Sequence, residues 1–164
     1  MTKKHPTLKE HTDEAEKFAR GYFNDNGQLA PMIDAIDEDG LHYVMLVPQI
    51  GGTGSERDAI ATGLAQFFKE KKIIQYVMMI EAWTLKMSQD ELIAAGGEVP
   101  RPSLSPNRVE IVCLQGETWK GENYGRSIDI DRSDGKAKLT TAMEFPSGST
   151  TGRFCNLLHT PSFN

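Results

Sequence analysis

Apolar residues in the first part of the chain recur every three or four positions, which is the spacing of one helix face. This pattern predicts a helix over residues 7–24. Thr7 and Glu10 have the spacing of a capping box, and Gly27 can take the left-handed conformation that ends a helix. The expected buried stripe consists of Ala15, Phe18, Ala19, Tyr22 and Phe23.

A second helical pattern follows the glycine-rich connector at residues 51–54. We expect this helix to begin at Ser55, with Asp58 in the N3 position of the cap. Its apolar stripe consists of Ile60, Leu64, Phe67 and Phe68.

Between these helices lie two extended runs, at residues 29–36 and 41–47. They flank Asp39-Gly40, which is a strong signal for a two-residue hairpin turn. Both faces of this hairpin carry apolar residues, so we expect it to lie near the sheet centre or to be covered on both sides. The turn predicts the pairs Ile36 with Tyr43 and Ile33 with Leu46.

Residues 73–85 form the most apolar run, which predicts a strand inside the sheet. Three more strands are expected at residues 109–118, 124–132 and 136–145, the last two joined by a turn at Asp134-Gly135. A two-residue turn there sorts apolar partners onto one face and charged partners onto the other. The predicted pairs are Ile130 with Leu139, Ile128 with Thr141 and Asp131 with Lys138.

The order of elements predicts an α+β fold. We expect one antiparallel sheet of five to six strands, with the two main helices packed on one face, because no βαβ unit is visible. The whole chain, residues 1–164, reads as a single domain. A long internal loop at residues 86–107 is expected to hold one short helix, over residues 89–95, and residues 147–164 read as a loosely structured tail.

Composition narrows the class of protein. The chain has 164 residues and a formal net charge of −5, which favours solubility and disfavours general nucleic-acid binding. No run of residues is long and apolar enough to span a membrane, and no secretory signal is visible. Two cysteines, Cys113 and Cys155, make no disulfide framework. We therefore expect a cytoplasmic protein.

One carboxylate stands out as a candidate for chemistry. Glu81 lies in the apolar strand on the face of Val77, Met79 and Trp83, where burial could raise its pKa and make it an acid or a base. Asp34 in the first hairpin is a potential companion. The alternative interpretation is that Glu81 lies where the strand leaves the core, or pairs with an arginine such as Arg108.

Other patterns indicate no specific site. The connector at residues 51–54 lacks the residues of a dinucleotide or phosphate loop. Cys155 and His159 are four apart, but nothing in the sequence completes a zinc set, and His11 is expected in a solvated segment. We therefore expect neither a metal site nor a cofactor. Trp119, Lys120, Tyr124 and Arg126 could form a surface for a partner protein.

Two short stretches support a resemblance. The run Glu81-Ala82-Trp83 closes the apolar strand, and Pro102-Ser103-Leu104-Ser105-Pro106-Asn107-Arg108-Val109-Glu110 leads into the next one. Together they resemble small uncharacterised proteins of bacteria and their phages. The resemblance implies no activity, but it directs attention to Trp83, Arg108 and Glu110 as candidate ligand-binding or catalytic neighbours of Glu81.

These observations favour a non-enzymatic interaction or assembly protein, which forms a homo-oligomer or binds a protein partner. The alternative is a small-molecule-binding or hydrolase-like protein with a pocket near Glu81, Arg108 and the 86–107 loop.

Overall fold

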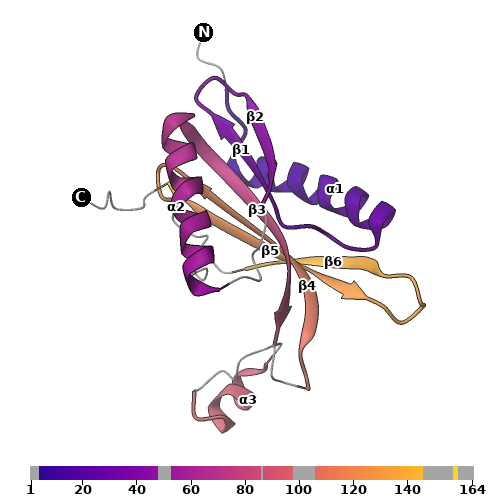
Figure 1. Cartoon of the computed structure of the whole chain (residues 1–164). Coiled ribbons are helices and arrows are strands. Elements are labelled where there is room, and N and C mark those ends of the chain that lie inside the picture. The colour runs from indigo at the N-terminus through magenta and orange to yellow at the C-terminus, as the bar shows by residue number, and fades with distance from the viewer. Residues whose placement is uncertain (1–3, 48–52, 86, 98–105, 146–156, 159–164) are drawn as a thin grey trace.

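The computed structural model describes residues 4–47, 53–85, 87–97, 106–145 and 157–158. The order of elements is helix, hairpin, helix, long hairpin with a short helix at its tip, and two final strands (Figure 1). Their bounds are α1 Leu8–Asn26, β1 Met32–Asp37, β2 His42–Leu46, α2 Gly54–Glu70, β3 Ile73–Thr84, α3 Gln89–Ala94, β4 Val109–Thr118, β5 Asn123–Asp131 and β6 Lys138–Glu144.

The strands form one open sheet in the order β2-β1-β3-β4-β5-β6. Every neighbouring pair is antiparallel. The expected α+β class, with a single antiparallel sheet of five to six strands, is therefore confirmed. The most apolar strand, β3, lies inside the sheet as predicted. No helix in the described part of the chain is long and apolar enough to cross a membrane.

The two main helices pack on opposite faces of the sheet, which corrects the expectation that they share one face. In Figure 1, α2 lies in front of the sheet and α1 behind it. The cause lies in β3, whose Val77 and Met79 enter the core under α1 while Tyr76 and Met78 enter the core under α2. Since successive side chains of a strand point to opposite faces, an apolar run of this kind needs a cover on each side.

Helix α1 has the two predicted caps, and it ends two residues later than the predicted residue 24. Thr7 and Glu10 form the reciprocal capping box, and Gly27 takes the left-handed conformation at φ 72°. Helix α2 starts slightly earlier than predicted. Its cap is Thr53 with Glu56, in place of Ser55 with Asp58, because Thr53 offers the same capping chemistry two residues upstream.

The β1–β2 hairpin has a register one residue away from the predicted one. Ile36 pairs with His42 and Ile33 with Met45, so residues 38–40 form a three-residue loop. Gly40 takes the left-handed conformation at φ 82° in this loop. The predicted two-residue turn is wrong because Asp37 accepts hydrogen bonds from the backbone N–H groups of Asp39 and Leu41, which stabilise the longer loop.

The β5–β6 hairpin confirms two of its three predicted pairs, Ile130 with Leu139 and Asp131 with Lys138. The third is wrong, because Ile128 pairs with Ala142. A β-bulge between Ile128 and Ile130 shifts the register by one residue there.

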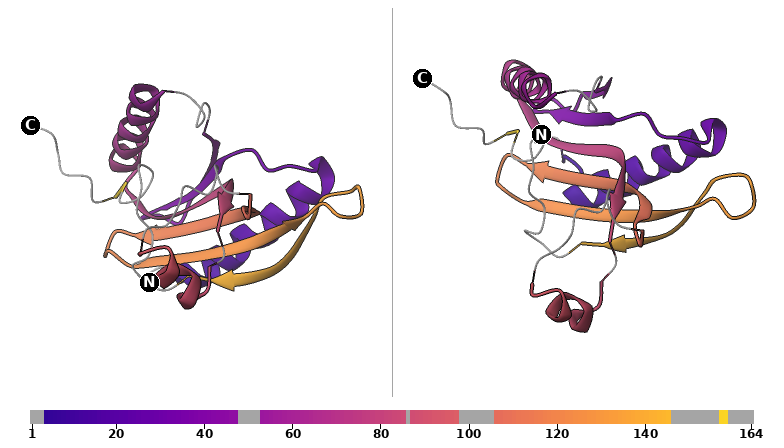
Figure 2. Two further views of the ribbon diagram at one scale, coloured as in Figure 1. Left: turned by 90° about the horizontal axis from the view of Figure 1, so that it is seen from below. Right: turned by 60° about the horizontal axis from the view of Figure 1, so that its bottom comes forward.

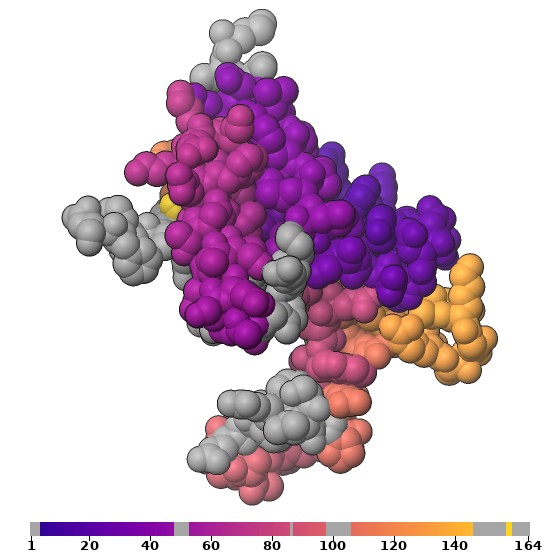
Figure 3. Space-filling model, in the orientation of Figure 1, coloured from indigo at the N-terminus to yellow at the C-terminus, as the bar shows by residue number. Residues whose placement is uncertain are grey.

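Strands β3 and β4 extend beyond the rest of the sheet and carry α3 at their end. Ser88 and Glu91 cap this helix, as predicted, and it buries none of its residues. Figures 2 and 3 show it standing away from the body of the protein. Residues 98–105 of the loop, most of the tail, Cys155 and His159 lie outside the described residues, although Leu157 is buried against the core under α2.

Candidate functional site

Glu81, the first candidate from the sequence, makes a contact that stabilises the fold. Its carboxylate accepts a hydrogen bond from the backbone N–H of Leu29 at 2.7 Å, which holds the segment between α1 and β1 against the sheet. Its strand neighbours Val77 and Met79, which the sequence placed on the same face, are buried under α1.

Glu81, Trp83 and Glu110 line one small hollow of about 190 Å³ beside Ile130. The guanidinium of Arg108 lies over the ring of Trp83, 4.3 Å from its centroid. Glu110 pairs with Arg132. The structure therefore brings together the residues that the resemblance pointed to.

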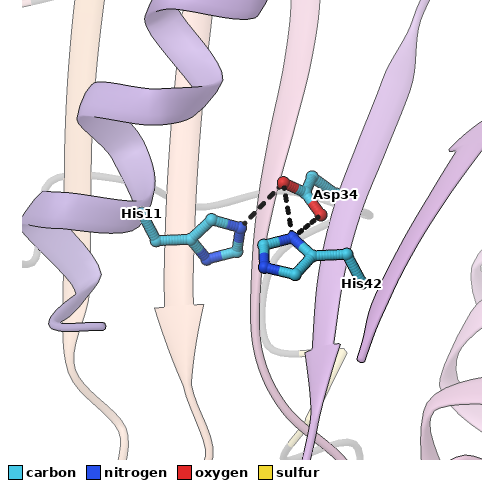
Figure 4. A group of neighbouring side chains, drawn as sticks. All are labelled: His11, Asp34 and His42. Atoms are coloured by element: carbon cyan, nitrogen blue, oxygen red, sulfur yellow. Dashed lines mark hydrogen bonds and ion pairs between the residues drawn. The ribbon is translucent and has the colours of Figure 1, made fainter. Parts of the chain in front are cut away.

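Asp34 is not part of this hollow. It pairs with Val77 on β3, four residues before Glu81, which corresponds to a separation of roughly 13 Å along the strand. Asp34 instead lies between two histidines, His11 of α1 and His42 of β2 (Figure 4). One helix and both strands of the edge hairpin thus contribute one side chain each.

Local structure explains why these side chains meet. His11 lies four residues before Ala15, which is four before Ala19, so it continues the buried stripe of α1 onto the sheet. Asp34 and His42 lie on neighbouring strands, two positions apart in register, and point to the same face.

The cluster is compact. Nε2 of His11 lies 3.2 Å from Oδ2 of Asp34. Nδ1 of His42 lies 3.1 Å from Oδ1 and 3.4 Å from Oδ2 of the same carboxylate. One ligand atom of each residue lies within 4.8 Å of the others. The two rings meet edge to face, with centroids 5.9 Å apart.

Burial is graded across the cluster. His11 is fully buried, the Asp34 side chain is 14% exposed and the His42 side chain is 44% exposed. Burial by itself raises the pKa of Asp34, but the close contacts and the charge of His11 and His42 outweigh it, so the pKa lies below its ordinary value. Asp34 is therefore a carboxylate at neutral pH.

On the other side of His11, the side chain of Gln75 holds the ring. Nε2 of Gln75, which is itself buried, lies 3.0 Å from Nδ1 of His11. A partner at one ring nitrogen sets the tautomer and leaves the other nitrogen to face the cluster. The arrangement can therefore fix the orientation of a charged or ligating imidazole.

The sequence analysis missed both histidines. The expectation that His11 is solvated is wrong, because the residue is completely buried. Its spacing to Ala15, Ala19 and Phe23 was the signal that could have placed it in the core. No comparable signal exists for His42, because its position depends on the three-residue loop of the hairpin.

Of the remaining candidates, Lys120 lies over Trp119 with its ammonium 5.7 Å from the ring centroid. Arg126 is buried and bonded to Asp13 and Glu16 of α1, so it belongs to the packing of the helix. The expected aromatic and basic surface is thus divided between an exposed turn and a buried network.

Comparisons of this chain with protein-family models, with curated proteins and with solved structures return no match. The resemblance to small bacterial and phage proteins therefore stays a prediction.

Proposed function

We propose that the protein is a self-associating assembly protein in which β2 of one copy pairs with β2 of a second copy. The observation that carries this proposal is the chemistry of the β2 edge. Among the described residues, β2 has a strand on one side only. Its sequence, His42-Tyr43-Val44-Met45-Leu46, contains neither proline nor a residue that is always charged.

Exposed apolar side chains accompany this edge. Leu41, Val44 and Leu46 are each more than half exposed. An uncharged edge of this kind offers unpaired backbone N–H and C=O groups to another strand. Monomeric proteins usually protect such an edge with charges, prolines or bulges.

The opposite edge of the sheet has that protection. Strand β6 begins with Lys138 and ends with Glu144, and its remaining exposed residues are mostly threonines. Its pairing with β5 also contains a β-bulge. The contrast between the two edges favours β2 as the surface where copies meet.

A two-fold axis through the middle of β2 makes the interface self-complementary. In this antiparallel arrangement Val44 lies opposite its own counterpart, and Leu46 lies opposite His42. Closed two-fold dimers are the most common form of homo-oligomer. Because strand pairing alone buries a modest area, we expect a dissociation constant on the order of 10 µM.

The test is the mass of the protein in solution, measured by analytical ultracentrifugation over a range of concentrations. The wild-type protein should pass from monomer to dimer. Val44→Lys should weaken the dimer by at least about tenfold, because it places like charges directly opposite each other. Thr141→Lys, which adds the same charge to the exposed face of β6, is the matched control and should dimerise normally.

A charge-reversal experiment tests the register. Val44→Lys and Val44→Glu should each be monomeric alone and should form a heterodimer when mixed. A wild-type protein that stays monomeric at millimolar concentration contradicts the proposal. So does a dimer that Val44→Lys leaves intact.

The hollow at Glu81 supports the alternative function less well. Glu81 holds the backbone of Leu29, and Glu110 holds Arg132. Both carboxylates are therefore engaged in contacts that stabilise the fold.

A further inference from the structure

A buried nitrogen of His11 has no hydrogen-bond partner. Nε2 is completely buried and makes no hydrogen bond, although Oδ2 of Asp34 lies 3.2 Å away. A buried polar atom without a partner is costly, on the order of 1–3 kcal/mol, and calls for an explanation. A bound ion between His11, Asp34 and His42 would supply one.

The distances from the carboxylate to the two histidine nitrogens match those between neighbouring ligands of a zinc ion. Bonds of about 2.0–2.1 Å at tetrahedral angles put neighbouring ligand atoms about 3.3 Å apart. One oxygen of Asp34, Oδ2, lies 3.2 Å from Nε2 of His11 and 3.4 Å from Nδ1 of His42. His42, the most exposed of the three side chains, has the freedom to adjust its nitrogen to the ion.

We propose that the protein binds one divalent transition-metal ion through Nε2 of His11, the carboxylate of Asp34 and Nδ1 of His42. The ion replaces the direct contacts between these side chains and gives the buried nitrogen a partner. It also ties α1 to the edge hairpin, since its ligands come from α1, β1 and β2. The observations that carry this site do not involve strand pairing at the β2 edge, although the proposed dimer would place Leu46 of the second copy opposite His42.

The types of ligand select the metal. Two imidazoles and one carboxylate suit zinc and neighbouring transition metals, whereas calcium and magnesium prefer oxygen ligands. Three protein ligands leave a fourth position for water, as in zinc sites that perform chemistry. The exposed side of the cluster is His42, so this position lies toward solvent.

Gln75 supplies the support that such sites require. A histidine that binds a metal through one nitrogen donates its other N–H to a neighbouring acceptor. The amide of Gln75, turned so that its oxygen faces Nδ1 of His11, provides that acceptor. Turning the amide exchanges two atoms of nearly equal size, so the packing is unchanged.

The test uses the full-length, untagged protein, stripped of metal with a chelator and titrated with Zn²⁺ by calorimetry. Wild-type protein should bind one ion per chain, and its melting temperature should rise on binding. His42→Ala and Asp34→Asn should each weaken binding by more than about 100-fold, because loss of a supporting residue alone costs about 10–100-fold. Gln75→Leu should fall within that smaller range.

His5→Ala is the matched control, since His5 is a histidine of the described chain outside the cluster. It should bind Zn²⁺ with wild-type affinity. His42→Ala changes a half-exposed side chain and should stay folded by circular dichroism, so lost binding cannot be ascribed to unfolding. In NMR spectra, Zn²⁺ should shift the ring resonances of His11 and His42.

Two results would overturn the proposal. One is a wild-type protein that takes up no stoichiometric Zn²⁺. The other is binding that survives in both His42→Ala and Asp34→Asn, because the ion would then lie elsewhere.

Discussion

Replacing Arg126 by methionine removes the charge that holds α1 to β5 while keeping an apolar stem of similar length. Arg126 is 7% exposed, and its guanidinium donates to Asp13 at 2.8 Å, to Glu16 at 3.1 Å and to the hydroxyl of Tyr124 at 2.7 Å. The Cζ atom of Arg126 also lies over the ring of Tyr124, 5.2 Å from the ring centroid.

The three contacts contribute different amounts to the free energy of unfolding. The Asp13 side chain is 48% exposed, so solvent screens its ion pair and the contribution is about 0.5 kcal/mol. The Glu16 side chain is only 19% exposed, so its charge-assisted hydrogen bond with Arg126 contributes about 1.5 kcal/mol, and Arg20 stays as its other partner. The bond to Tyr124 adds about 0.5–1 kcal/mol. We therefore expect Arg126→Met to lower the free energy of unfolding by about 2.5 kcal/mol.

Urea denaturation followed by circular dichroism measures this change. A double-mutant cycle with Glu16→Gln isolates the interaction between Arg126 and Glu16. Once Arg126 is gone, Glu16→Gln removes only the ion pair with Arg20, so the double variant should lose less stability than the two single variants together. A loss below about 0.5 kcal/mol, or strict additivity in the cycle, would refute the assignment of Arg126 as the link between α1 and the sheet.

The remaining predictions concern the β1–β2 loop. Gly40→Ala should destabilise the protein by about 1–2 kcal/mol in urea denaturation, because φ 82° is unfavourable for any residue with a Cβ; an unchanged midpoint would contradict this. For Asp37, burial raises the pKa, but hydrogen bonds from Leu41, Tyr43 and Asp39 outweigh it and lower the pKa overall. Its stabilising effect is therefore present above the unfolded pKa of about 4 and is lost as pH falls below it. Asp37→Asn should flatten that part of the stability–pH curve, and a curve of unchanged slope would contradict the assignment.

Local features of this fold could be predicted because they depend on neighbouring residues. The capping box of Thr7 with Glu10, the cap of Ser88 with Glu91, and the hairpin pairs Ile130–Leu139 and Asp131–Lys138 all follow from short-range spacing. The sequence by itself therefore determined the element order, the antiparallel sheet and the α+β class.

Only the tertiary structure decided which elements meet. Apolar residues on both faces of β3 require two covers, but nothing in their spacing says which helix takes which face. The bulge between Ile128 and Ile130 changes the register of β5 and β6, and the turn signal does not predict it.

The His11–Asp34–His42 cluster shows the same division. The sequence alone singled out Asp34, but paired it with the wrong companion. Its true neighbours come from α1 and β2, and they meet it only after the helix has packed behind the sheet and the hairpin has closed through a three-residue loop. Contacts between distant segments arise from packing and strand register, and neither is encoded in the spacing of nearby residues.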